Sequence, residues 1–113
     1  MRHPAVRCLS HPKGRILNHR PPNALELETV IDVALGHGVA LEVNGLPSRL
    51  DLAGPDVRLA LEAGVPVVVS TDAHSVAGLG NLRLAVATAR RGWATAADVL
   101  NTRPLDEVLA HRR

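Results

Sequence analysis

The sequence predicts an α/β fold built on a parallel sheet. Three short apolar runs, at 6–10, 39–44 and 65–70, show no polar alternation, which is typical of strands buried on both faces. Helical patterns separate these runs, so strands and helices alternate along the chain. Such alternation favours parallel strands with right-handed connections. Because three strands leave a sheet with two open edges, we expect the chain to form part of a larger barrel or sheet.

The first helix is expected between Asn23, which can cap it together with Glu26, and the GHG sequence at 36–38. The helical period places five apolar residues on one stripe, which we expect to face the core: Leu27, Val30, Ile31, Ala34 and Leu35.

Proline and glycine mark the ends of the later helices. Pro55 opens the second helix, where its missing N–H is harmless, and Gly64 closes it. The third ends at Gly92, and "TAAD" at 95–98 resembles a capping box for a short helix. A last helix is expected to start near Pro104. The third helix carries its expected apolar stripe on Leu79, Leu82, Val86 and Ala89.

The 113 residues suit one small domain. Apolar residues make up 46% of the chain, with no Phe or Tyr, so the core must be aliphatic and aromatic stacking on nucleic-acid bases is excluded as a main binding mode. The single Cys8 excludes an internal disulfide and suits a reducing cytoplasm, where we expect the protein. No apolar run is long enough to span a membrane.

The formal charge of +2 is unevenly placed. Before Glu26, the first acidic residue, the chain carries a basic block of Arg2, Arg7, Lys13, Arg15 and Arg20. This block favours an anionic partner such as a phosphate group or nucleic acid. A solvated basic edge is the alternative, and it stays open at this point.

Polar residues follow each predicted strand. The first run leads into "SHPKGR" at 10–15, the second ends in "EVN" at 42–44, and the third leads into Asp72 and His74. The carboxyl ends of parallel strands meet at one edge of the sheet, which is where ligand sites gather. We therefore expect these three groups to lie together.

Asp72 and His74 are two positions apart, and in an extended chain such residues point to the same side. A carboxylate oxygen and an imidazole nitrogen there can share a divalent ion, to which His11 could add a third ligand. Lys13 and Arg15 would lie beside it and hold a phosphate group. The alternative is a loop in which Asp72 caps the following segment and His74 is exposed.

Four segments, "LSHPKGRIL", "ALEVNGLPSRLDL", "VVVSTDAHS" and "ARRGWATAADVLNT", resemble the C-terminal half of a PHP (polymerase and histidinol phosphatase) domain. They are most like the PHP domain of bacterial family-X DNA polymerases, and they occur in that family's order over nearly the whole chain. The resemblance implies that residues 1–113 form part of a distorted (β/α)7 barrel. That barrel carries zinc or manganese at its strand ends and hydrolyses phosphate esters, in the polymerases as a 3′-to-5′ exonuclease.

The resemblance also assigns roles to residues. His11, Asp72 and His74 match metal ligands, and Asp72 would be the catalytic carboxylate that joins or orients the metals. Arg15, Asn44 and Arg49 match positions near the substrate, and Lys13 would offset phosphate charge. For Asn44 and Glu42, a hydrogen bond at the strand end is an equally good interpretation.

The sequence departs from the family pattern as well. The opening H-x-H motif, the early carboxylates, the middle histidines and the polymerase domains do not occur in these 113 residues. We therefore expect a phosphoesterase fragment that is incomplete as a catalyst alone and acts on a phosphate ester or a DNA 3′ end. The alternative is a non-catalytic module that pairs with a second copy or a separate N-terminal half through bare strand edges. DNA binding by the basic block is a third, weaker hypothesis.

Overall fold

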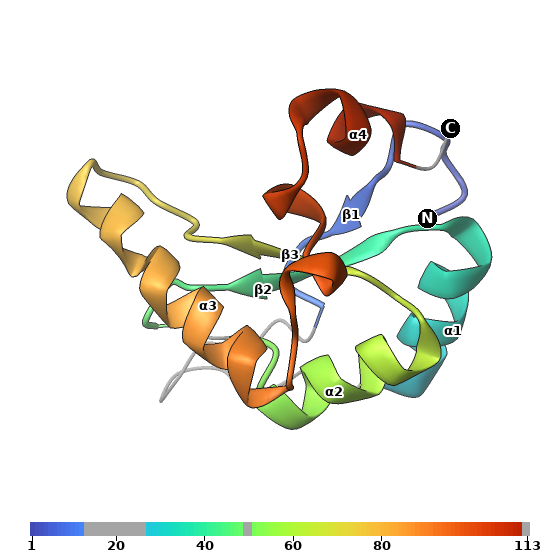
Figure 1. The fold of residues 1–113 in the computed structure, drawn as a ribbon, viewed down its shortest axis with the longest axis horizontal. Coiled ribbons are helices and arrows are strands. Elements are labelled where there is room, and N and C mark those ends of the chain that lie inside the picture. Colours follow the sequence, from blue (N-terminus) through green and yellow to red (C-terminus); the bar gives the residue numbers. More distant parts are fainter. Residues whose placement is uncertain (13–26, 49–50, 112–113) are drawn as a thin grey trace.

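The computed structural model describes residues 1–12, 27–48 and 51–111 (Figure 1). The described chain contains a parallel sheet in the order β1-β2-β3, formed by β1 (Cys8–Leu9), β2 (Ala40–Asn44) and β3 (Val67–Ser70). Leu41 in the central strand pairs with Leu9 on one side and Val67 on the other. The predicted α/β class with parallel strands is confirmed, although β1 is shorter than the apolar run that predicted it. Closure into a barrel stays a prediction.

The helices are α1 (Leu27–His37), α2 (Gly54–Ala63), α3 (Leu82–Arg91) and α4 (Leu105–Ala110). Figure 1 shows α1, α2 and α3 as an arc on one side of the sheet, where α2 contacts both α1 and α3. The glycine and proline rules predicted α2 correctly, since Pro55 lies in its first turn and Gly64 ends it in the left-handed conformation at φ 93°. The predicted cap at Asn23 and Glu26 lies outside the described residues.

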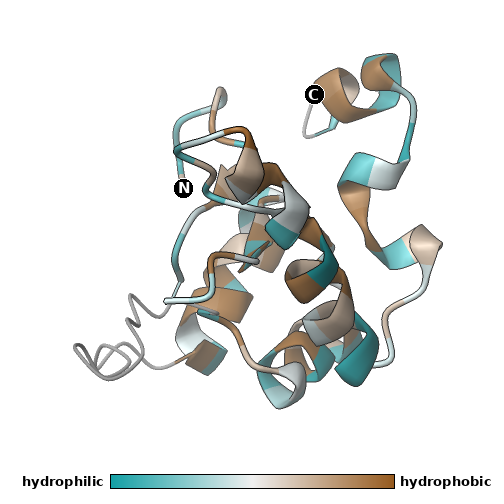
Figure 2. Cartoon of the chain, turned by 90° about the vertical axis from the view of Figure 1, so that its left-hand side faces the viewer, coloured by the Kyte–Doolittle hydropathy of each residue, from teal (hydrophilic) through white to brown (hydrophobic). Residues whose placement is uncertain are grey.

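The core is aliphatic, as the composition predicts (Figure 2). Helix α1 contributes Val30, Ile31 and Ala34, but Leu35 from its predicted stripe is exposed. Leu35 follows Ala34 by one residue, a step of about 100° around the helix, and therefore turns away from the core. The buried apolar cluster contains Val30, Ile31, Ala34, Val39, Leu41, Val43, Leu52, Val57, Ala60, Val65, Val67, Ala85 and Val99.

The predicted buried face of α3 is largely wrong. Its buried residues are Ala85, Thr88 and Ala89, whereas Leu79, Leu82 and Val86 are 61, 42 and 40% exposed. Small side chains let the backbone of α3 approach β2, β3 and α2 closely, and Thr88 satisfies its hydroxyl by donating to the Leu84 carbonyl at 2.9 Å. The large apolar residues on this helix therefore lie on the outer side. Leu79 does not belong to α3; it lies in the 3₁₀ turn Ala77–Asn81 that precedes this helix.

The outer edge of β3 is covered, which differs from the bare edges that the sequence suggested. Val67 forms a parallel bridge with Val99. The amide of Asn101 then takes the place of a neighbouring strand at Val69. The Val69 N–H donates to Asn101 Oδ1 at 3.1 Å, and Asn101 Nδ2 donates to the Val69 carbonyl at 2.7 Å. This covering removes two pairing groups from an edge strand rich in valine.

The C-terminal segment packs beside the N-terminal one (Figure 1). The guanidinium of Arg7 donates to the Leu109 carbonyl in α4 at 3.0 and 3.3 Å. Before α4, the predicted capping box is confirmed, because Thr95 donates from its N–H and its hydroxyl to Asp98 Oδ2 at 2.8 and 3.1 Å. The helix that it caps is a single 3₁₀ turn, Ala96–Asp98. Among the described helices, none is long and apolar enough to cross a membrane.

Gly92 is required for packing, not for a left-handed turn. Its φ is −88°, and the left-handed residue after α3 is Trp93 at φ 63°. A Cβ on Gly92 would lie 2.7 Å from the Val57 side chain and 2.8 Å from the Gly54 carbonyl. The ring of Trp93 lies under Arg58 of α2, whose guanidinium is 5.3 Å from the ring centre.

We predict that Gly92→Ala lowers the free energy of unfolding by about 1–3 kcal/mol, because the added methyl overpacks the contact between α2 and α3. The matched control is Gly36→Ala in α1, where a Cβ meets nothing within 4 Å. This second substitution should stabilise the chain by about 0.5–1 kcal/mol, as expected for Gly to Ala in a helix. Urea unfolding of both variants measures the difference, and equal effects would contradict the proposed contact.

Candidate functional site

The predicted grouping of polar residues at the strand ends is confirmed for His11, Glu42, Asn44 and Asp72. His11 follows β1, Glu42 and Asn44 lie in β2, and Asp72 follows β3. The three strands run parallel, so these segments reach the same edge of the sheet. Distances of 3.2–3.5 Å between polar atoms connect each of these side chains to at least one other.

His11 and Asp72 face each other across this edge. The His11 Nε2 atom lies 3.5 Å from Asp72 Oδ2, and both side chains are partly exposed. Their backbones share an uncommon conformation, with φ 48° at His11 and φ 52° at Asp72. A non-glycine residue in the left-handed region costs of order 1–3 kcal/mol and is enriched at functional sites, although Trp93 shows that it also occurs elsewhere in this chain.

Glu42 is the centre of the hydrogen-bond network. Its Oε1 atom accepts from the Ser10 hydroxyl at 3.1 Å, from the His11 N–H at 3.1 Å and from Asn44 Nδ2 at 3.2 Å. Its Oε2 atom accepts from the Ser70 hydroxyl at 2.8 Å. The carboxylate therefore ties the ends of all three strands together. The sequence offered a signal for this, because Glu42 and Asn44 are two apart within a strand and so share a side.

Asn44 is 1% exposed and both ends of its amide are engaged. Its Oδ1 accepts from the Leu46 N–H at 2.8 Å, which directs Nδ2 toward Glu42 Oε1 at 3.2 Å and His11 Nδ1 at 3.3 Å. This geometry supports the strand-end interpretation of Asn44. Contact with a substrate, which the family resemblance implied, stays a prediction.

The expected alignment of Asp72 with His74 is wrong in this structure. Strand β3 ends at Ser70, and the positive φ of Asp72 breaks the extended conformation on which the alternation argument depended. His74 is exposed at a bend, as the alternative loop interpretation expected. The role of His74 as a ligand stays a prediction. The candidates Lys13, Arg15 and Arg49 lie outside the described residues.

The His11 and Asp72 side chains fit a divalent ion by donor type and spacing. Two donors bound to one zinc ion at about 2.0–2.2 Å with a tetrahedral angle lie about 3.3–3.6 Å apart. The 3.5 Å between Nε2 and Oδ2 agrees with such a shared ion, and it also agrees with a long hydrogen bond. Within 1–12, 27–48 and 51–111, no three His, Cys, Asp or Glu side chains gather as a group able to hold a metal ion.

The Cys8 thiol near the site is not a nucleophile. Burial of the side chain, together with the charge of Glu42, raises its pKa to about 12. A thiol that stays protonated at neutral pH neither attacks nor binds a metal readily. Among the described groups at this edge, the carboxylates and the imidazole are therefore the candidates for binding a metal ion.

The environment of Glu42 predicts a pH dependence of stability. Burial raises its pKa, but hydrogen bonds from the His11 backbone, Ser70 and Asn44, together with the His11 charge, outweigh burial and lower the pKa below its ordinary 4.5. A carboxyl with a lowered folded-state pKa stabilises the fold fully above its unfolded value and loses this contribution as the pH falls through the folded value.

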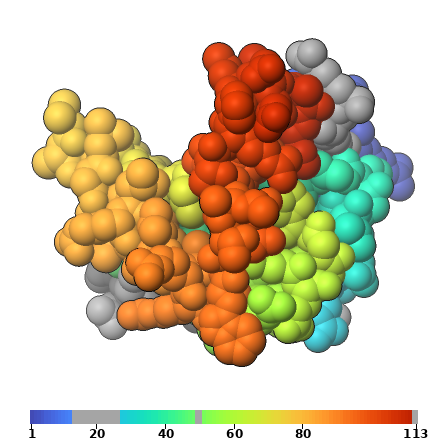
Figure 3. Space-filling view, in the orientation of Figure 1, coloured from blue at the N-terminus to red at the C-terminus, as the bar shows by residue number. Residues whose placement is uncertain are grey.

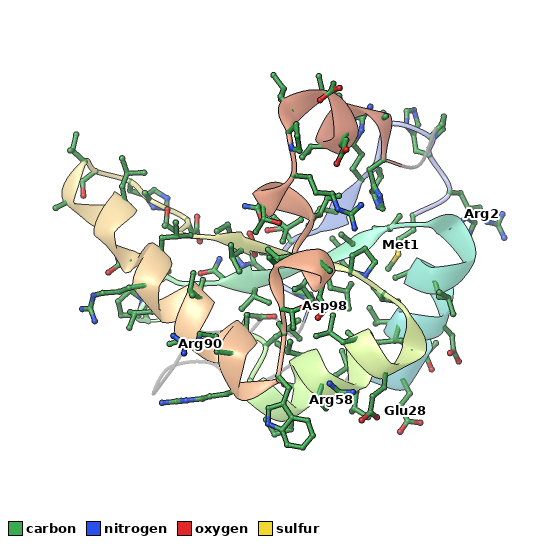
Figure 4. The ribbon with its side chains drawn as sticks, viewed as in Figure 1. Met1, Arg2, Glu28, Arg58, Arg90 and Asp98 are labelled. Atoms are coloured by element: carbon green, nitrogen blue, oxygen red, sulfur yellow. The ribbon has the colours of Figure 1, made fainter. Side chains whose placement is uncertain are left out.

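We therefore expect the melting temperature to fall as the pH decreases below about 4.5, and to fall less steeply in Glu42→Gln. Thermal unfolding followed by circular dichroism between pH 7 and pH 3 measures this. Glu28→Gln, at the exposed start of α1 (Figure 4), is the control and should keep the wild-type slope. Parallel pH profiles for wild type and Glu42→Gln would contradict the effect.

Comparison with known proteins gives one strong similarity. The chain is 37% identical over 105 residues to the "DNA polymerase/3′-5′ exonuclease PolX" of Bacillus subtilis (strain 168). The aligned region covers 93% of this chain and 18% of that protein, so the chain spans about a fifth of the length of its relative. No family model matches the chain. The sequence is thus related to one part of a DNA polymerase and exonuclease.

Proposed function

We propose that this chain is part of a metal-dependent phosphoesterase of the PHP type, in which His11 and Asp72 bind one divalent ion, zinc or manganese. The observation that carries the proposal is the 3.5 Å approach of His11 Nε2 to Asp72 Oδ2 at the carboxyl end of the sheet. The similarity to a 3′-5′ exonuclease supports a phosphate ester, such as a DNA 3′ end, as the substrate class.

When bound, the ion would polarise a phosphoryl oxygen and lower the pKa of a coordinated water. The protein residues would hold and orient the reacting groups. His11 would ligate through Nε2 and Asp72 through Oδ2, while Glu42 and Asn44 would keep His11 in place. Lys13, Arg15 and Arg49 would offset phosphate charge on the substrate side, with Arg15→Ala weakening substrate binding more than metal binding.

Two described donors bind one ion weakly, whereas hydrolysis of phosphate esters commonly uses two or more metals. We therefore propose that full activity needs further ligands, His74 among them, and others from polypeptide beyond these 113 residues. The 18% coverage of the polymerase relative supports this division of the site.

The first test is the zinc and manganese content of the purified chain, measured on a sizing column so that the mass is known. We expect bound metal in the wild type that is lost in His11→Ala. The control is His3→Ala, an exposed histidine whose Nδ1 atom accepts a local hydrogen bond from the Ala5 N–H. Metal retained by His11→Ala, or a wild-type chain that binds neither ion when titrated, would overturn the proposal.

A second candidate function is assembly without catalysis, and the outer face of α3 favours it. Leu82 and Val86 are exposed there, next to exposed Leu79 in the preceding 3₁₀ turn, and a groove of about 310 Å³ lies between α3 and the C-terminal segment, with Val69 and Val99 in its lining (Figure 3). On this hypothesis the wild type forms a dimer on the sizing column and Leu82→Glu is a monomer. A monomeric wild type across concentrations would remove it.

A further inference from the structure

We infer that the outer face of α3 binds the phosphate backbone of a nucleic-acid strand through three arginines, Arg83, Arg90 and Arg91, which we call the basic ridge. The choice of nucleic acid as the polyanion rests on the proposed function, whereas the ridge is a feature of the chain itself. All three side chains are exposed. The surrounding segment, 73–97, contains no Asp or Glu, so it supplies no negative charge to offset them.

The guanidinium groups of the ridge do not hold the fold together. Among the residues that the structure describes, none forms an ion pair or a hydrogen bond with them. Other arginines are engaged, since Arg7 donates to the Leu109 carbonyl at 3.0 Å and Arg58 pairs with Glu62 at 2.9 Å. The ridge therefore presents its full set of donors to the solvent or to a ligand.

Helical geometry places Arg83 and Arg90 on one line. They are seven residues apart, about 20° short of two full turns, so their side chains leave α3 in nearly the same direction. The same interval separates them by about 10 Å along the helix axis, and Arg91 adds a third charge in the last turn. Charges spread over this length fit successive phosphates of an extended strand better than one isolated phosphate group. Each guanidinium is able to hold a phosphate through two parallel hydrogen bonds.

The ridge starts at the same edge of the sheet as the candidate metal site. Gly45 directly follows β2, and a Cβ on it would lie 2.5 Å from the Asn81 carbonyl at the start of α3. The first turn of α3, which carries Arg83, is therefore packed against this strand end. From there α3 runs toward the start of α2 (Figure 1), where the Arg91 Cβ lies against Gly54. A strand with its end at the candidate metal site would thus continue along the ridge.

Trp93 lies at the far end of the ridge, two residues after Arg91. Its ring is 74% exposed, and the Arg58 guanidinium lies 5.3 Å from the ring centre. An exposed indole is able to stack on one base of a bound strand. One ring makes no stacking track, so the arginines must supply most of the affinity, and binding should depend strongly on salt. The chain has one Trp and no Tyr or Phe, so intrinsic fluorescence reports on this end of the ridge alone.

The test is the binding of a fluorescein-labelled oligothymidine to the whole chain in EDTA, which removes metal ions and prevents cleavage by the proposed site. Fluorescence anisotropy at several salt concentrations gives the affinity. The logarithm of the wild-type binding constant should fall linearly with the logarithm of the salt concentration. In Arg83→Gln/Arg90→Gln the slope should become shallower by about 0.7 for each arginine, the value for single strands. The melting curve should not change, because both side chains are exposed. Unlabelled oligothymidine should quench the Trp93 emission of the wild type over the same concentrations.

The matched control is Arg2→Gln/Arg103→Gln, which removes the same charge from exposed positions outside α3. It should keep the wild-type slope. Equal changes of slope in the two double variants would mean that net charge attracts the strand, and would overturn the inference. Binding that leaves the Trp93 emission unchanged would place the strand elsewhere, with the same consequence.

Failure of this inference and failure of the proposed function give different results. His11→Ala should bind the oligonucleotide in EDTA as the wild type does, because the ridge needs no metal ion. A wild type that binds zinc or manganese but no oligonucleotide would overturn the ridge and leave the proposed metal site standing. A wild type that binds the oligonucleotide through the ridge but binds neither metal would support the ridge and overturn the metal-dependent function.

Discussion

Where a complete site forms, replacing Asp72 with asparagine should abolish metal-dependent phosphoester hydrolysis and leave the fold intact. The amide keeps the shape of the carboxylate but loses the negative charge that pairs with a cation. The backbone should tolerate the change, because Asp72 has φ 52° and asparagine is one of the few residues that adopts this region readily. We expect at least a 100-fold loss of manganese-dependent cleavage of a 3′-labelled oligonucleotide, with an unchanged circular dichroism spectrum and melting curve.

Asp32→Asn, at an exposed position of α1, is the matched control and should keep the wild-type turnover. Unchanged turnover in Asp72→Asn would remove Asp72 from the mechanism. Zinc and manganese titrations of the same variants give a readout that does not depend on activity. We expect the affinity for either ion to fall in Asp72→Asn and to stay constant in Asp32→Asn.

His74→Ala distinguishes two arrangements of the same site. If His74 is a ligand, as its spacing from Asp72 predicts, its loss should weaken metal binding as strongly as Asp72→Asn does. The exposed position of His74 would then require the segment after Asp72 to close onto the ion. If His74→Ala keeps the wild-type affinity, the ligands from the described residues are His11 and Asp72.

The elements that the sequence predicted best are those with strong local rules. Pro55 and Gly64 mark the two ends of α2. Proline lacks the N–H that a helix interior needs, and glycine readily adopts the left-handed conformation that ends a helix. The strands were predictable because runs such as 65–70 are apolar up to their last residue, Ser70, as expected of strands covered on both faces. The edge of the sheet at which polar groups gather then followed from parallel pairing alone.

Local sequence rules did not predict the features that depend on tertiary packing, such as the buried face of α3. Large apolar residues at helical spacing predicted the buried face of α3, but the close approach at Gly92 admits only small side chains, so Ala85 and Ala89 are buried in place of Leu82. Alternation failed at Asp72 and His74 because the strand had already ended, which the sequence does not reveal. Alternation predicted correctly that Glu42 and Asn44, both inside β2, share a side of the strand. The sequence did not reveal how many hydrogen-bond donors surround the Glu42 carboxylate, which accepts from Ser10, His11 and Ser70.

The second large effect that we expect is on stability. Leu41 is 0% exposed and lies at the centre of the sheet, where it pairs with Leu9 and Val67. Leu41→Ala should lower the free energy of unfolding by about 2–5 kcal/mol, because the removed methyl groups leave a cavity that a pleated, hydrogen-bonded strand cannot collapse to fill. A domain of this size has of the order of 5–15 kcal/mol in total, so the variant should unfold at a much lower urea concentration.

Leu35→Ala is the matched control, since it deletes the same atoms from a side chain that is 50% exposed on α1. We expect this change to cost less than about 1 kcal/mol, because little of the leucine surface is removed from water in the fold. Equal losses in the two variants would mean that the sheet is not the centre of the core. A large loss confined to Leu41 would show that the strands are held by packing on the central residue, and that the same packing sets the spacing between β1 and β3 across which His11 and Asp72 meet.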